Sequence, residues 1–201
     1  QLADELRRIA EIGRIVSSSL DLADVYSLLA ENVRTLVRAD RMVIAIMSED
    51  GTEWVDRYID GVRIPGESDG SSRRIEDSDA STAIIVDKVP AVYAGSDIRG
   101  YNVGSSEEKL RQKTGLNSLM MLPLLWQGSS YGVLAFRAFD PDAFGQHQIE
   151  IGQQIASQIA GAIATSSQFS LLERESSDRK QLAEINRIMG ASLNLAEIFD
   201  E

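Results

Sequence analysis

The residues best suited to chemistry are few in this sequence, and histidine and cysteine set the limits. His147 is the only histidine, so no site can use two histidines to bind a metal, and a Ser/His/Asp triad would need this one residue. Cysteine is absent. Its absence excludes disulfides, iron–sulfur clusters held by cysteine, cysteine-type zinc sites, thiol nucleophiles and thioether-linked chromophores. We expect neither catalysis by this chain nor a metal site.

Five acidic residues gather in a stretch rich in glycine, serine and aspartate: Glu67, Asp69, Glu76, Asp77 and Asp79. They lack the alternating ligand spacing and the central glycine of a calcium-binding loop, so we expect a solvated, mobile surface loop. Neither a GxxxxGK(S/T) motif nor a GxGxxG motif occurs in the sequence. The sequence therefore predicts no phosphate-binding loop of either kind.

The overall charge is acidic, with 20 Lys and Arg against 31 Asp and Glu and a formal net charge of −11. Nucleic acids and anionic lipids both attract clustered cations, so we expect neither as a partner. No run approaches the roughly 20 apolar residues of a membrane span. We expect a cytoplasmic location with no direct membrane contact by this chain.

Hydrophobic periodicity predicts helices and strands in an order that suits one α+β domain. An amphipathic helix should begin at Asp21, its expected N-cap, and end near Val37. The segment 118–125 (SLMMLPLL) is too apolar to alternate, so both of its faces should be buried. The later elements are expected as strands over 41–48 and 52–59, a loop over 60–80, a helix over 81–86, a strand over 89–93, a helix over 105–113, strands over 118–125 and 130–139, and a long helix from about 146.

The chain contains an internal repeat. Residues 9–26 (IAEIGRIVSSSLDLADVY) resemble residues 182–199 (LAEINRIMGASLNLAEIF), so a second copy of the opening unit begins near the carboxyl end. Such repetition is typical of tandem modules joined by helices. A short heptad stripe in the first helix predicts a homodimer through the terminal helices, and it consists of Leu2, Leu6, Ile9 and Val16.

Three motifs occur in an order and spacing that are typical of one family. They are SLDLADVY (19–26), TAIIVDKVPAVY (82–93), and the strand pair GLNSLMMLPL (115–124) with YGVL (131–134). Over about residues 20–166 the sequence resembles the GAF family. The resemblance implies an α+β fold, with an antiparallel sheet, helices packed on one face, and a pocket on the other face covered by loops and helices. The expected organisation is an N-terminal signalling and dimerisation helix over 1–18, a GAF domain over 19–166, a connector helix over 167–190, and the truncated start of a second GAF module over 191–201.

The resemblance implies a ligand pocket but does not name the ligand. Eight residues are expected to line it: Val92, Tyr93, Asp97, Ile98, Tyr101, Leu110, Met120 and Met121. The tyrosines and methionines could equally fill a core, and Asp97 could cap a turn; the residues leave both readings open.

Known ligands of the family fit this sequence poorly. Asp97 stands where bilin-binding relatives carry Asp-Ile-Pro, but Arg99 replaces the proline and no cysteine can attach a bilin, so no covalent bilin is expected. Asn117 lacks the lysine that follows it in relatives that bind cyclic nucleotides. His147 is expected at the surface and not as a haem ligand, because a haem pocket belongs on the opposite face of the sheet.

The sequence leaves two functions open, and neither is enzymatic. The first is a sensory module that binds a small ligand or a partner and relays its state through the terminal helices to an output domain. The alternative is a ligand-free dimerisation and spacer module. Because GAF arrays commonly precede such outputs, the expected parent is a histidine kinase of a two-component system, with a diguanylate cyclase or a phosphatase as alternatives.

Overall fold

The computed structural model describes residues 26, 30, 33, 36–76, 79–94 and 105–164. The chain divides into a unit of residues 1–163, which carries every described strand, and a unit of residues 164–201. The segments expected over 1–18, 167–190 and 191–201 lie outside the described residues, and so does the stripe of Leu2, Leu6, Ile9 and Val16. The dimer helix therefore stays a prediction.

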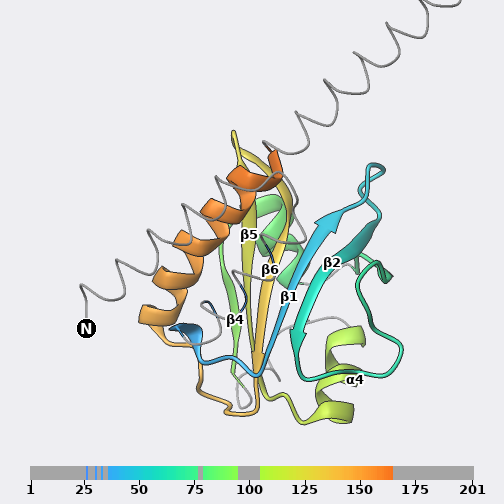
Figure 1. The fold of residues 1–201 in the computed structure, drawn as a ribbon, viewed down its shortest axis with the longest axis vertical. Helices are drawn as coiled ribbons and strands as arrows, with labels where there is room; N and C mark the ends of the chain where they lie inside the picture. The colour runs from blue at the N-terminus through green and yellow to red at the C-terminus, as the bar shows by residue number, and fades with distance from the viewer. Residues whose placement is uncertain are drawn as a thin grey trace, which may run out of the picture. The chain divides into compact units, whose positions relative to one another are not determined.

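The first unit is built on one antiparallel sheet, as the fold class predicted (Figure 1). Its strands lie in the order β3-β2-β1-β6-β5-β4, so the first strand pairs with the last in the middle of the sheet. The strand bounds are Arg41–Met47 (β1), Glu53–Gly61 (β2), Ser72–Arg74 (β3), Ala91–Tyr93 (β4), Ser118–Trp126 (β5) and Ser129–Ala138 (β6). A two-residue turn joins β5 to β6, and Gln127 and Gly128 both have positive φ there (49° and 78°), as hairpin turns of the primed types require.

Both faces of the central strands are covered, and this follows from their composition. In β1 the side chains of Met42 and Ile44 enter one core, whereas Val43 and Ala45 enter the other. The alternation along a strand separates neighbouring residues in this way. The run of β5 is buried on both sides from Ser118 to Leu124, which confirms the expectation for this apolar segment.

Helices cover the first face. The closing helix over residues 146–164, orange in Figure 1, lies along the sheet. Its start is capped by one side chain, since Gly145 N donates to Gln148 Oε1 at 3.2 Å. The described positions of the opening helix, Tyr26, Ala30 and Val33, are buried at helical spacing in the same core. We call this side of the sheet the helix face.

Shorter elements cover the second face. They are α3 (Asp79–Thr82), the π-helical turn η1 (Ala83–Asp87) and α4 (Ser105–Thr114). We call this side the pocket face. The π-helical turn ends at Lys88, which takes a left-handed conformation and donates from Nζ to the Gly128 carbonyl. Strand β3 lies where the sequence predicted only loop, because its three residues SRR have no apolar pattern. Within the described part of the chain, no helix is long and apolar enough to span a membrane.

Candidate functional site

The pocket face has an apolar and aromatic floor at its centre. Trp54 from β2, Ile84 from η1, Tyr93 from β4 and Met121 from β5 are all buried in one cluster. Ala135 of β6 lies among them, and its small side chain adds little bulk to the floor. This cluster separates the sheet from the elements that cover it.

Buried charges replace the apolar floor toward one end of the same face. Strand alternation brings Arg41 of β1, Asp56 of β2 and Arg137 of β6 to this side, where their exposed fractions are only 1%, 1% and 6%. Arg41 and Arg137 are cross-strand partners in the ladder between β1 and β6. Like charges placed directly opposite destabilise a sheet, so each guanidinium needs its own carboxylate.

Arg137 pairs with Glu107, a residue of the first turn of α4. Arg137 Nη2 donates to Glu107 Oε1 at 2.5 Å, and Arg137 Nε donates to Glu107 Oε2 at 3.3 Å, so the contact is bidentate. Burial opposes the charge on both groups, but their mutual attraction outweighs it, lowering the pKa of Glu107 and raising the pKa of Arg137. Both groups are therefore ionised at neutral pH, and the pair fixes α4 to the sheet.

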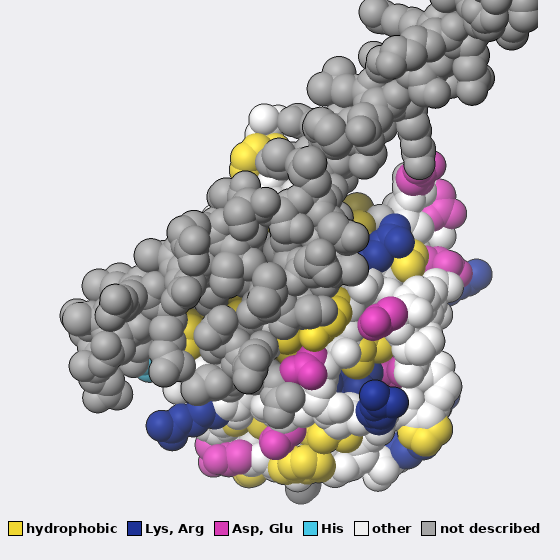
Figure 2. Space-filling model, viewed as in Figure 1, with side chains coloured by type: hydrophobic (Ala, Val, Ile, Leu, Met, Phe, Trp, Pro, Cys, Tyr) yellow, Lys and Arg dark blue, Asp and Glu magenta, His cyan; other side chains and the backbone are white. Residues whose placement is uncertain are grey.

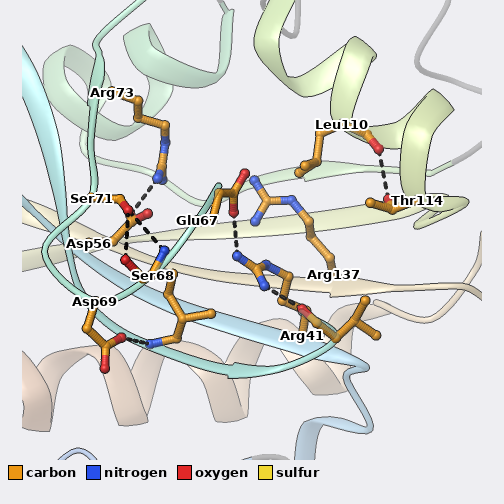
Figure 3. A network of polar contacts seen from close by, with 12 residues as sticks. Arg41, Asp56, Glu67, Ser68, Asp69, Ser71, Arg73, Leu110, Thr114 and Arg137 are labelled. Carbon is orange, nitrogen blue, oxygen red and sulfur yellow. Dashed lines mark hydrogen bonds and ion pairs between the residues drawn. The ribbon is translucent and has the colours of Figure 1, made fainter. Parts of the chain in front are cut away.

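Arg41 pairs with the loop that follows β2. Its Nη2 donates to Glu67 Oε2 at 2.5 Å, and its Nη1 donates to the Val62 carbonyl. Figure 3 shows the guanidinium groups of Arg41 and Arg137 next to each other, with the Glu67 carboxylate beside them. Burial lowers the pKa of Arg41 despite Glu67, although an arginine stays charged at any physiological pH. Among the described residues, Arg41 Nε is buried without a hydrogen-bond partner.

The third pair joins β2 to β3. Arg73 Nη1 donates to Asp56 Oδ1 at 2.5 Å, and Arg73 remains about one-third exposed while Asp56 is buried. Asp69 accepts a hydrogen bond from the Ile59 amide at 2.9 Å. The expectation of a solvated loop is therefore wrong for Glu67, whose carboxylate folds back onto the buried Arg41, whereas Asp69 is exposed as expected.

Two hollows open beside this network, and the ion pair of Arg137 and Glu107 lines both. The first is open to solvent and lies between α4 and the ends of β4 and β5, with Tyr93 and Leu110 in its wall. The second is also open and lies between α3 and the sheet, with Trp54, Arg73 and Met121 among its lining residues. Apolar walls with a few convergent charges are typical of small-molecule sites.

The eight residues predicted to line a pocket do not all lie together. Tyr93 and Leu110 line the first hollow, and Met121 lines the second. Val92 and Met120 do not line these hollows: they pack in the core on the helix face, because each precedes a pocket-face residue by one position in its strand. The remaining three, Asp97, Ile98 and Tyr101, lie outside the described residues.

The charged centre of the site was not predicted from the sequence. Arg41 and Arg137 stand in otherwise apolar strand segments, RMVIAIM and LAFRA, at positions that share a face with Val43 and Ala135. A charged residue on a buried face is rare unless it is paired. The position of both arginines on a buried strand face was therefore a signal, readable from the sequence, that each one is paired. Their partners could not be predicted, because Glu67 lies in a loop and Glu107 in a helix, and no local pattern predicts where these elements pack.

Other chemical candidates lie away from the hollows. His147 is exposed near the start of the closing helix, at the surface as predicted. In the described part of the chain, no three histidine or acidic side chains are grouped so as to hold a metal ion. On the side seen in Figure 2, the acidic and basic side chains that are drawn in colour are interspersed.

Comparisons with known proteins agree with this architecture. The model of the GAF domain matches residues 21–163. The phycocyanobilin-bound GAF domain of a cyanobacterial phytochrome is similar in fold, with a TM-score of 0.66, 21% identity, and coverage of 81% of this chain and 94% of that one. The GAF domain of an Acinetobacter phosphoenolpyruvate-protein phosphotransferase gives a TM-score of 0.64 at 16% identity, covering 81% and 93%.

A third structure is the second GAF domain of DevS from Mycobacterium smegmatis, with a TM-score of 0.53, 25% identity, and coverage of 75% of this chain and 99% of that one. A comparison with curated proteins gives no match. The matched family model extends over more than half of the chain, from the opening helix to the closing one. This chain belongs to the GAF family, whose domains are non-catalytic sensory and regulatory modules of signalling proteins.

Proposed function

We propose that this GAF domain senses a small molecule that binds in the hollows on the pocket face. The observation that carries the proposal is the ion pair of Arg137 and Glu107, which lines both hollows and joins α4 to the sheet. A ligand that fills either hollow would lie beside this pair. Binding and the position of α4 are then coupled, as a sensor requires, since a ligand acts only through its different affinity for two states.

The sheet offers a route from the pocket face to the helix face. Met121 lines a hollow, whereas its chain neighbours Met120 and Leu122 pack in the core that contains the closing helix. Contact with that helix is close, because a Cβ added to Gly152 would lie 2.5 Å from Leu122 Cδ1. Packed interiors transmit small displacements, so a shift of β5 would reach the closing helix.

The proposal includes an assembly and a parent protein. We expect a homodimer through the terminal helices, with the stripe of Leu2, Leu6, Ile9 and Val16 at its centre. Relay to a downstream output, in a histidine kinase or alternatively a diguanylate cyclase or phosphatase, rests on family analogy. A cytoplasmic location is part of the same proposal.

Native mass spectrometry of the protein purified from its own cells tests ligand binding. We expect a small molecule to travel with the wild-type protein and to be lost from Leu110→Trp, whose larger side chain would fill the first hollow. Lys109→Trp is the matched control, because Lys109 is the exposed neighbour on the same helix. If neither protein carries a small molecule, the sensing function is contradicted and the alternative, a ligand-free dimerisation and spacer module, is supported.

A further inference from the structure

The ion pair that lines the hollows has one fixed partner and one partner that can leave. Arg137 belongs to a central strand, flanked by β1 and β5, and only 7% of its side chain is exposed. Glu107 belongs to the short helix α4, and 21% of its side chain is exposed. Water can therefore reach the carboxylate more easily than the guanidinium. Displacing Glu107 would leave the sheet itself unchanged, because Glu107 belongs to α4 and not to a strand.

The surroundings define what could replace the Glu107 carboxylate. Arg41 stands opposite Arg137 in the sheet, and Arg73 lines the second hollow, so three guanidinium groups converge on this end of the pocket face. A neutral ligand that displaced Glu107 would leave Arg137 buried and unpaired, which is strongly unfavourable. An anionic group would keep the charge balance unchanged. The floor beyond it is apolar and aromatic, with Trp54, Tyr93 and Met121.

We propose that Glu107 occupies the place of a ligand carboxylate, and that a small carboxylic acid with an apolar or aromatic body displaces it from Arg137. This inference rests on the proposed function and adds the class of ligand and the regulated contact. The ligand carboxylate accepts the two N–H groups of Arg137 that Glu107 now holds, and its body lies on the apolar floor. Glu107 becomes hydrated, and α4 loses its ionic attachment to the sheet.

Benzoate and benzamide are suitable probes, because they have the same shape and differ in charge. Amide NMR titrations of the folded protein would give their dissociation constants. We expect benzoate to bind more tightly than benzamide and to shift the resonances of α4. Glu107→Gln removes the internal competitor, so benzoate should bind about tenfold more tightly, as a charge-assisted contact to an unpaired guanidinium implies.

Two control variants make the result specific. Glu150→Gln removes an exposed carboxylate of the closing helix, which accepts a hydrogen bond from Gln146 and lines neither hollow, and should leave the benzoate affinity unchanged. Arg137→Lys keeps the charge but loses the two-point geometry, and should weaken benzoate binding at least about tenfold. Circular dichroism of each variant establishes that the domain is folded.

The proposal is overturned if benzamide binds as tightly as benzoate, or if Glu107→Gln binds benzoate no better than Glu150→Gln does. Absence of benzoate binding to Glu107→Gln would overturn it as well. Equal binding of both probes at the pocket face would leave the sensing function standing and remove only the anion assignment. Loss of the sensing function itself would appear separately, as an absence of any bound molecule in the native protein.

Discussion

Replacing Glu107 by glutamine should destabilise the domain, because it leaves the buried Arg137 guanidinium without a counter-charge. The pair is held at 2.5 and 3.3 Å, with side-chain exposures of 7% for Arg137 and 21% for Glu107. Removing one partner of a fully buried pair typically costs about 3–5 kcal/mol. Glutamine keeps one hydrogen-bond acceptor and the site is partly hydrated, so we expect a loss of about 2 kcal/mol.

The loss should depend on pH in a defined direction. The pKa of Glu107 lies below its ordinary value in the folded protein, where burial raises it but Arg137 lowers it more. The pair therefore stabilises the fold fully above the unfolded pKa of about 4.3 and loses its effect as the pH falls through the folded value. The difference in stability between wild type and Glu107→Gln should be constant from pH 7 to 5 and should shrink below about pH 4.

Urea denaturation followed by circular dichroism measures this difference at each pH. Glu108→Gln is the control, because its carboxylate sits one residue away and pairs with Arg111 on the surface. A stability difference for Glu107→Gln that is absent at pH 7, or equally large at pH 3.5, would refute the assigned role of the ion pair.

Three further predictions concern the helices and the assembly. Gly152→Ala should leave the domain about 1–3 kcal/mol less stable than Gly161→Ala in urea denaturation, because the new Cβ would lie 2.5 Å from buried Leu122 at position 152 but 3.3 Å from its nearest neighbour at position 161. Both substitutions gain the same helix propensity, so the difference reports on packing alone. Equal stabilities of the two variants would contradict the close packing at Gly152. His147→Ala should change thermal stability by less than about 0.5 kcal/mol, and a larger loss would mean that this exposed residue has a structural role. Removing residues 1–18 should convert a dimer into a monomer in sedimentation velocity at tens of micromolar, with the fold checked by circular dichroism, and an unchanged monomer would contradict the dimer proposal.

The fold could be predicted to a large extent because its elements have strong local signals. Strand β5 is an apolar run bounded by Asn117 and by the turn at Gln127 and Gly128, so its existence and its burial on both faces follow from composition. The three-residue strand β3 has no such signal, because its pairing with β2 is stabilised by backbone hydrogen bonds and by the pair of Arg73 with Asp56.

The site could be predicted only in part, and strand geometry explains the errors. Adjacent residues of a strand face opposite sides, so Met120 and Met121 could not both line one pocket, and the same holds for Val92 and Tyr93. To predict which of two adjacent strand residues faces the pocket, the register of the sheet must be known, and pairing between strands distant in the sequence sets that register. The charged centre was missed because Arg137 obtains its carboxylate from thirty residues earlier in the chain.

The adjacent methionines Met120 and Met121 can show whether the domain binds a small molecule on its pocket face, because one lies on each face of β5. Methyl-labelled methionine spectra of the protein from its own cells would be compared before and after bound small molecules are stripped by unfolding and refolding. We expect the Met121 methyl resonance to move most, and the Met120 resonance to move less, because Met120 lies in the core of the helix face and senses the ligand only through the shift of β5. A change at Met120 without one at Met121, or identical spectra before and after stripping, would contradict the claim that this domain binds a small molecule on its pocket face.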